Sequence, residues 1–158
     1  MTALLRRLLL AVLLVAGPAA ADNMLMARVP LRAEITIEYV NASIQEHGYR
    51  IAHLQLCDGG MTEAGYKSDV YRVVFFGKVD EVRMISDRYP ELVSYLPLKI
   101  AVIAEKDETL LAALSPEALE SFYSDEALHI QLGRWQNDII SIFDEVRRGV
   151  ASRTAAMP

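Results

Sequence analysis

The pattern that most constrains the fold is a helical segment followed by two strand-like segments, which occurs twice along the chain. Residues 34–47 place apolar side chains on one helical face, and strand-like segments follow at 49–58 and 70–77. Residues 79–97 begin with helical spacing, which Pro90 is expected to break, and precede a β-hairpin over 98–115. Two successive helix–strand–strand units predict a pseudo-symmetric, curved antiparallel or mixed sheet with helices packed on one face.

Further elements flank these two units. Weak alternation over 24–31 predicts a first strand, and Ser115 before Pro116 is typical of a helix N-cap followed by the first helical residue. A last helix is predicted over about 125–148, with Gly149 ending it. Its apolar stripe consists of Leu128, Leu132, Trp135, Ile139, Ile142 and Val146. The predicted order is therefore β-α-β-β-α-β-β-α-α, an α+β fold.

The N-terminal segment has the features of a secretory signal peptide. Two arginines precede an apolar run over 8–16, which is too short to span a bilayer, and Ala19-Ala20-Ala21 provides a small-residue cleavage site. We expect residues 1–21 to be removed and the protein to be periplasmic or secreted. An uncleaved membrane anchor is the alternative. The mature chain would hold one domain over 22–149 and a flexible tail over 150–158.

Charge and cysteine content exclude several classes of protein. The full chain carries 16 basic and 21 acidic residues, and loss of the two arginines before the apolar run leaves the mature protein more acidic still. Nucleic acid and anionic membrane surfaces attract clustered Lys and Arg, so neither is an expected partner after signal cleavage. One cysteine cannot form an internal disulfide, so the hydrophobic core must hold the fold alone.

The strand over 49–58 contains the sharpest local feature, Cys57 four residues after His53. Strict alternation predicts a core-facing set of Ala52, Leu54 and Leu56. It also predicts an outward set on the open face of the sheet, consisting of Ile51, His53, Gln55 and Cys57. Residues four apart on a strand are separated by about 13 Å. That distance argues against a thiolate–imidazole pair or a shared metal.

Five residues are the candidates for ligand or interface contacts. They are His53, Gln55 and Cys57 on the open face, with Tyr66 and Lys67 in the following loop. The open face is too apolar to be simply solvated, so it should meet a second subunit, a ligand or a covering helix. For Cys57 two readings stay open: a free thiol lining an interface, and an intermolecular disulfide across a dimer axis.

Standard catalytic and cofactor signatures are missing from the chain. It has no C-x-x-C, H-E-x-x-H, G-x-S-x-G or phosphate-loop motif, and no catalytic residue is assigned. No cofactor is predicted, with copper as the alternative because thioether and imidazole groups can bind it. The possible copper ligands are Met24, Met26, Met61, His47 and His53. Methionines that merely fill gaps are the competing reading.

Two acidic pairs and the single tryptophan receive structural readings. Asp80/Glu81 and Asp125/Glu126 are adjacent in sequence, so their side chains diverge by about 100° on a helix and cannot form an acid–base pair. They are interpreted as solvated surface and helix-start charges. Trp135 lies on the stripe of the last helix and is expected in the core.

Several segments resemble a known family over about residues 24–146. They are ASIQEHGYRIAHLQL, VYRVVFFGK, DRYPELVSYLPLKIAVIAE and LLAALSPEALESF, with the Leu96-Pro97 turn the most specific. The chain resembles the family called domain of unknown function 302. The resemblance implies a small α+β fold with a curved sheet, able to dimerise, and no settled activity. Cysteines common in that family after the central strand and after the Leu-Pro pair are absent here, where the residues are Phe76-Gly77-Lys78 and Leu98.

Together these observations favour an exported, non-catalytic binding or interaction module that forms a homodimer through its open sheet face. Its partner would be a small ligand or another periplasmic protein. The competing class is a ligand- or metal-handling protein, or a small enzyme, with a pocket between the open face and the loop over 58–69. A flat apolar face matched to its symmetry mate would favour the first class. A pocket with displaced pKa values would favour the second.

Overall fold

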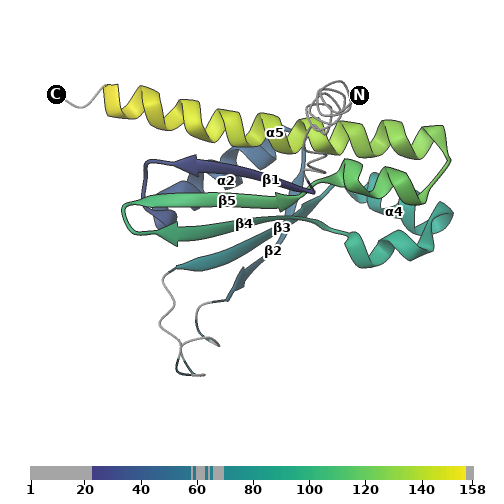
Figure 1. Ribbon diagram of the computed structural model, residues 1–158, viewed down its shortest axis with the longest axis horizontal. Helices are drawn as coiled ribbons and strands as arrows, with labels where there is room; N and C mark the ends of the chain where they lie inside the picture. The colour runs from purple at the N-terminus through teal and green to yellow at the C-terminus, as the bar shows by residue number, and fades with distance from the viewer. Residues whose placement is uncertain (1–22, 58, 60–62, 64, 66–69, 156–158) are drawn as a thin grey trace, which may run out of the picture.

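The computed structural model describes residues 23–57, 59, 63, 65 and 70–155, with side chains up to residue 149. Five antiparallel strands form one sheet in the order β1-β5-β4-β3-β2 (Figure 1). The strands are β1 (Met24–Val29), β2 (Arg50–Leu56), β3 (Tyr71–Gly77), β4 (Leu98–Glu105) and β5 (Glu108–Leu114). The helices are α2 (Ala33–Glu46), α4 (Val79–Arg88) and α5 (Glu126–Ala155), with 3₁₀ segments η1 (Pro90–Tyr95) and η2 (Pro116–Phe122).

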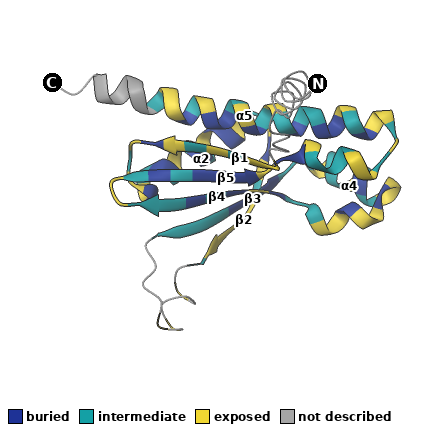
Figure 2. Cartoon of the chain, in the orientation of Figure 1, coloured by how far each residue is buried: buried dark blue, intermediate teal, exposed yellow. Residues whose placement is uncertain are grey.

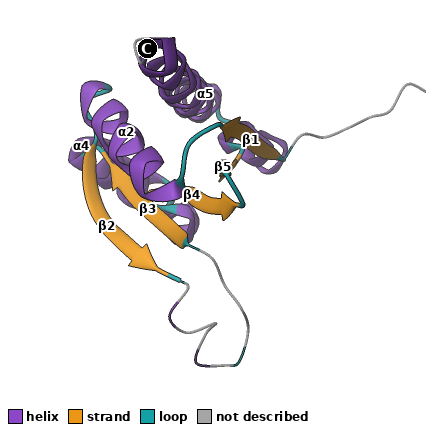
Figure 3. Ribbon diagram, turned by 90° about the vertical axis from the view of Figure 1, so that its left-hand side faces the viewer, coloured by secondary structure: helices purple, strands orange, loops and turns teal. Residues whose placement is uncertain are grey.

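The expected α+β fold is confirmed, and the described helices pack against one face of the sheet. Figure 3 shows α2 and α5 on the same side of the curved strands. The core between them is built mainly from large apolar side chains, of which Trp135, Phe76 and Ile44 are fully or almost fully buried. Buried positions alternate along the inner strands and recur on the sheet-facing sides of the helices (Figure 2). The predicted stripe of the last helix is buried at all six positions.

A β-bulge interrupts the alternation of β2, so the face predicted for Ile51 is wrong, and the burial predicted for Ala52, Leu54 and Leu56 is also wrong. The pairing with β3 shifts between Ile51 and His53, which leaves Ala52 as the extra residue. Ile51 therefore packs against the core, opposite the buried Phe76. Ala52 is exposed, as are the two leucines predicted to be buried: Leu54 is 37% and Leu56 58% exposed. His53 and Gln55 keep their predicted place on the open face, opposite Phe75 and Val73.

The segment between β3 and β4 follows the prediction that Pro90 breaks a helix. Tyr89 leaves the helical region with φ −137° and ψ 66°, which ends α4 and starts the 3₁₀ segment η1. The Leu96–Pro97 peptide bond is cis. Ser115 precedes a 3₁₀ segment. Its side chain was predicted to cap that segment but does not. Its hydroxyl donates instead to Gln136 Oε1 of α5, at 2.9 Å.

The last helix is longer than its sequence predicts. α5 continues to Ala155, six residues past Gly149. A Cβ at position 149 would lie 3.2 Å from Cε1 of Tyr39, so this glycine allows close approach of α5 and α2 rather than a stop. Within the described residues no helix is long and apolar enough to cross a membrane. The predicted signal peptide over 1–21 lies outside the described residues.

Candidate binding site: a fork in the open sheet face

The face of the sheet away from the helices is lined by rows of side chains from neighbouring strands. Pairing places Val73 beside Ala101, Ala101 beside Ala112, and Ala112 beside Met26. Gln55 extends this row onto β2. Two adjacent alanines lower the centre of the face between larger side chains, so the row has a shallow middle and raised ends.

The sheet forks beside this row, where β4 and β5 stop pairing. Their ladder runs from Glu105/Glu108 to Ala101/Ala112, although β4 begins at Leu98 and β5 ends at Leu114. Figure 1 shows the two strands separating toward the end where each meets its 3₁₀ segment. The hydroxyl of Tyr95, from η1, donates to the carbonyl of Leu114 at 3.3 Å and bridges the fork. Beyond Ala101 and Ala112, the facing backbone groups of β4 and β5 are thus not joined by the ladder.

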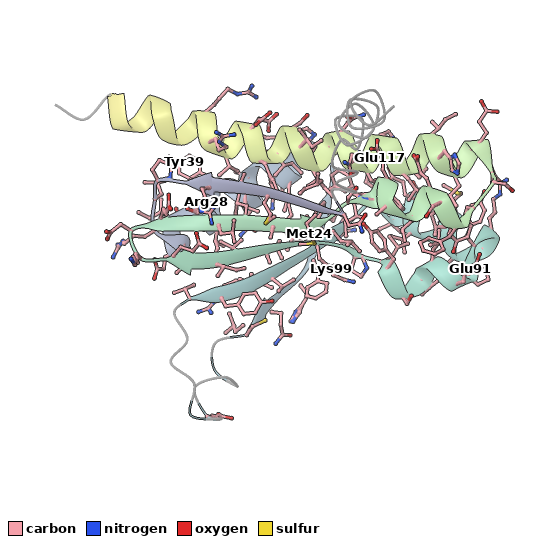
Figure 4. All side chains as sticks on the ribbon, in the orientation of Figure 1. Met24, Arg28, Tyr39, Glu91, Lys99 and Glu117 are labelled. Atoms are coloured by element: carbon pink, nitrogen blue, oxygen red, sulfur yellow. The ribbon has the colours of Figure 1, made fainter. Side chains whose placement is uncertain are left out.

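A slot of about 290 Å³ opens at this fork. The slot extends past the sheet to Ile139 of α5, a residue that is 1% exposed. Figure 4 shows Met24 and Lys99 at the fork end of the sheet. The lining consists of Met24, Tyr71, Val73, Tyr95, Leu98, Lys99, Ala101, Ala112, Ala113, Leu114 and Ile139.

Lys99 supplies the one charge among the described residues that line the slot. Its Nζ donates to the carbonyl of Tyr95 at 3.3 Å and lies 5.9 Å from the centre of the Tyr95 ring. Burial raises the pKa of Tyr95 to about 12, so its hydroxyl stays a neutral donor at physiological pH. The slot therefore combines an apolar floor with one cation and one phenol at its rim.

The residues predicted at the other end of the face are only partly brought together. His53 Nε2 lies 3.2 Å from Gln55 Oε1, and the His53 ring packs against Phe75 with centroids 6.0 Å apart. Cys57 is a half-exposed free thiol whose Sγ lies 3.9 Å from the carbonyl of Gln55. None of these three lines the slot. Tyr66 and Lys67 lie outside the described residues.

A polar network on the helix side was not predicted. Glu145 of α5 accepts hydrogen bonds from Ser43, at 2.5 Å, and from His47, at 3.1 Å. Both hydrogen bonds lower the pKa of Glu145, and the one from Ser43 has the larger effect. Tyr49 donates to Asp138 at 2.5 Å, and burial together with this bond raises the pKa of Tyr49 well above its ordinary value. Each group has a partner inside the network, which joins α5 to the C-terminal end of α2.

A second part of the network centres on Glu81 and overturns its reading as a solvated charge. Its side chain is 15% exposed, and its carboxylate accepts from Trp135 Nε1 at 2.6 Å and from Arg134 at 2.8 Å. Asp80 beside it is 97% exposed, as predicted. Trp135 is in the core as expected, at 1% exposure. No sequence signal marked Glu81, because Arg134 and Trp135 lie more than 50 residues away along the chain.

The possible copper ligands are not gathered by the fold. Met24 and Met26 lie on β1 and His53 on β2, at opposite edges of the sheet, whereas His47 belongs to the helix-side network. Met61 lies outside the described residues. Within the part of the chain that is described, no three His, Cys, Asp or Glu side chains could hold one metal ion.

Comparison with known proteins gives the family. The family described as domain of unknown function DUF302 matches residues 26–146. The chain belongs to the DUF302 family. A crystal structure of an uncharacterised conserved DUF302 protein from Bacillus stearothermophilus is similar, with a TM-score of 0.72 and 18% identity, over 80% of this chain and 100% of that one. No curated protein matches the chain. The DUF302 likeness confirms the fold, and the family's description assigns no activity.

Proposed function

We propose that this DUF302 protein is an exported, non-catalytic binding module that holds a small amphipathic anion in the fork of its open sheet face. The observation that carries the proposal is the interrupted ladder beyond Ala101 and Ala112, which opens a slot with an apolar floor and Lys99 at its rim. A carboxylate would pair with the ammonium group, and its hydrocarbon chain would lie over the alanines.

The size and chemistry of the slot support this ligand class. A volume of about 290 Å³ lies at the lower end of the range for small-molecule sites, so a chain of roughly eight carbons is a suitable probe. The lining residues that are described include one cation and no carboxylate, which supports binding rather than acid–base catalysis.

Calorimetric titration of octanoate into the mature protein tests the proposal. We expect saturable binding at micromolar to millimolar octanoate, with 1-octanol binding more weakly because it cannot pair with the ammonium group. Lys99→Gln should weaken octanoate binding about tenfold, the loss typical of one charge-assisted hydrogen bond. Ala101→Leu should abolish binding by filling the slot.

Lys106→Gln, in the exposed turn between β4 and β5, is the matched control and should bind octanoate as the wild type does. Absence of saturable binding by the wild-type protein would contradict the proposal. Equal affinity of Lys99→Gln and wild type would also do so.

A second candidate is self-association through the open face. It is favoured by three exposed apolar side chains at the β1 end of that face: Met24 (42%), Met26 (64%) and Leu114 (44%). A second copy placed there would cover the fork, so octanoate and the dimer would compete. Met26→Lys should then abolish self-association, which analytical ultracentrifugation would detect.

A further inference from the structure

The outer edge of β2 is unpaired among the described residues. β2 pairs with β3 on one side and is the last strand of the sheet on the other (Figure 3). At the opposite edge, α5 packs along β1. Unpaired edges invite pairing with another chain, and proteins commonly protect them with charge, proline, a bulge or a covering element.

The chemistry of β2 after its bulge offers little of this protection. From His53 to Cys57 there is no Lys, Arg, Asp, Glu or Pro, although the chain is rich in charge elsewhere. Leu54 and Leu56 are 37% and 58% exposed on the helix side of this strand. The bulge at Ala52 limits the regular edge to the five residues that follow it.

The direction of the backbone groups follows from the pairing with β3. Cys57 N–H donates to the carbonyl of Tyr71 at 3.0 Å, so residues 57, 55 and 53 direct their backbone groups toward β3. Leu54 and Leu56 lie at the alternate positions, and their N–H and C=O groups therefore point outward. Two exposed leucines thus also carry the backbone groups that a further strand would use. Within one copy the Leu56 carbonyl accepts from Gln55 Nε2 at 3.1 Å, a bond that pairing with a further strand would share or replace.

We propose that β2 pairs edge to edge, antiparallel, with β2 of a second copy, centred on Gln55, so that two sheets join into one of ten strands. In this register Gln55 lies opposite its own copy, and Leu54 lies opposite Leu56 of the other copy. His53 lies opposite Cys57 of the other copy, twice in the dimer. The strand is self-complementary: all five residues after the bulge pair, and no like charges meet.

Neighbouring registers fit less well. If the two-fold axis of the dimer passed through Leu54, Leu56 would lie opposite the bulged Ala52 of the other copy. If it passed through Leu56, His53 would have no strand residue opposite it. Only the axis on Gln55 uses the whole stretch from 53 to 57 while keeping Leu54 and Leu56 as the hydrogen-bonded positions.

This edge dimer gives His53 and Cys57 a joint position that neither has within one copy. Positions that are directly opposite but not hydrogen-bonded to each other have Cα atoms about 4.5 Å apart, against about 13 Å for the same residues along one strand. A Cys57–Cys57 disulfide is excluded in this register, since the two cysteines lie at opposite ends of the paired stretch. The fork at β4 and β5 stays open, so the edge dimer does not depend on the proposed ligand.

Site-directed cross-linking tests the register. In a Cys57→Ser background, Gln55→Cys should form a disulfide-linked dimer under mild oxidation, because position 55 meets its own copy. Met26→Cys in the same background is the matched control, exposed on the open face at the other end of the sheet, and should stay uncross-linked. Efficient cross-linking at position 26 with none at position 55 would overturn the proposal.

Analytical ultracentrifugation of the mature protein over about 1–300 μM tests dimerisation through the β2 edge without a covalent cross-link. The wild type should dimerise, and Leu56→Lys should weaken dimerisation at least tenfold by placing two charges on the shared edge. Met26→Lys, an equally exposed substitution, should dimerise like the wild type. Circular dichroism melts confirm that both variants fold. A wild-type monomer throughout, or a dimer broken by Met26→Lys and kept by Leu56→Lys, would overturn the proposal.

Discussion

At the residue scale, Glu81 shows how a side chain with an unremarkable sequence position can hold the core in place. It is adjacent to the fully solvated Asp80, yet its carboxylate accepts the indole N–H of Trp135 and a hydrogen bond from Arg134. Because the tryptophan is 1% exposed, its N–H depends on that carboxylate for a partner. The pair therefore ties α4 to α5.

Replacing Glu81 should destabilise the protein. Glu81→Ala leaves the Trp135 N–H buried without an acceptor, and we expect a loss of about 1–3 kcal/mol in the free energy of unfolding. Asp80→Ala is the matched control and should change it by less than about 0.5 kcal/mol. Urea unfolding followed by tryptophan fluorescence measures both. Similar losses for the two variants would contradict the role assigned to Glu81.

At the scale of elements, helix ends are set by specific residues rather than by periodicity. α2 is followed, two residues past its end, by Gly48, whose φ of +76° lies in the left-handed region and whose N–H donates to the carbonyl of Gln45. α5 is preceded by Asp125, whose Oδ1 accepts from the N–H of Ala127 at 2.9 Å. Gly149 was predicted to end α5 in the same way, but no positive φ occurs there and the helix continues.

Adding a β-carbon at Gly48, just after α2, should lower the free energy of unfolding. Gly48→Ala has space, since the added atom would lie 3.7 Å from Cε of Lys78, but it forces an L-residue into the left-handed conformation. We expect a loss of about 1 kcal/mol from this strain. Gly48→Asn should lose less, because asparagine tolerates that conformation. Chemical denaturation of both variants provides the measurement, and a more stable Gly48→Ala would refute the argument.

The start of α5 should make stability depend on pH. The hydrogen bond from Tyr89, at 2.6 Å, followed by the backbone bonds at the cap, lowers the pKa of Asp125. A lowered native pKa contributes stability that is present above the unfolded value, about 4, and is lost as pH falls through the native pKa. The urea concentration at the unfolding midpoint should therefore decrease as the pH is lowered below 5. Asp125→Asn should make this decrease smaller. Parallel pH curves for wild type and variant would show that Asp125 makes no contribution.

At the scale of the whole molecule, the sheet has one face packed by helices and one left open, and function is proposed for the open side. The fork lies between β4 and β5, and β3 separates it from the free edge of β2. Ligand and second copy can therefore occupy the molecule at once. Only self-association through the open face itself would make the two compete.

Export should be visible in the mass of the mature chain. Cleavage after Ala21 would leave a protein beginning at Asp22, directly before the first strand. We expect intact-mass measurement of protein from the periplasm of a bacterial host to match residues 22–158. Retention of the apolar leader in a membrane fraction would contradict the signal-peptide reading and favour an anchor.

The element order, the α+β class and most of the core follow from local patterns, although the helix expected after Ser115 is a 3₁₀ segment. The stripe of α5, the hairpin over 98–115 and Pro90 breaking a helix all act within a few residues. The remaining features depend on tertiary contacts. The bulge at Ala52 placed Ile51 on the face opposite to the predicted one. Side chains alternate between the two faces of a strand, so one extra residue changes the face of Ile51 relative to the residues after the bulge. The interrupted ladder at the fork, and the bond between Glu81 and Trp135, depend on partners far apart in the chain.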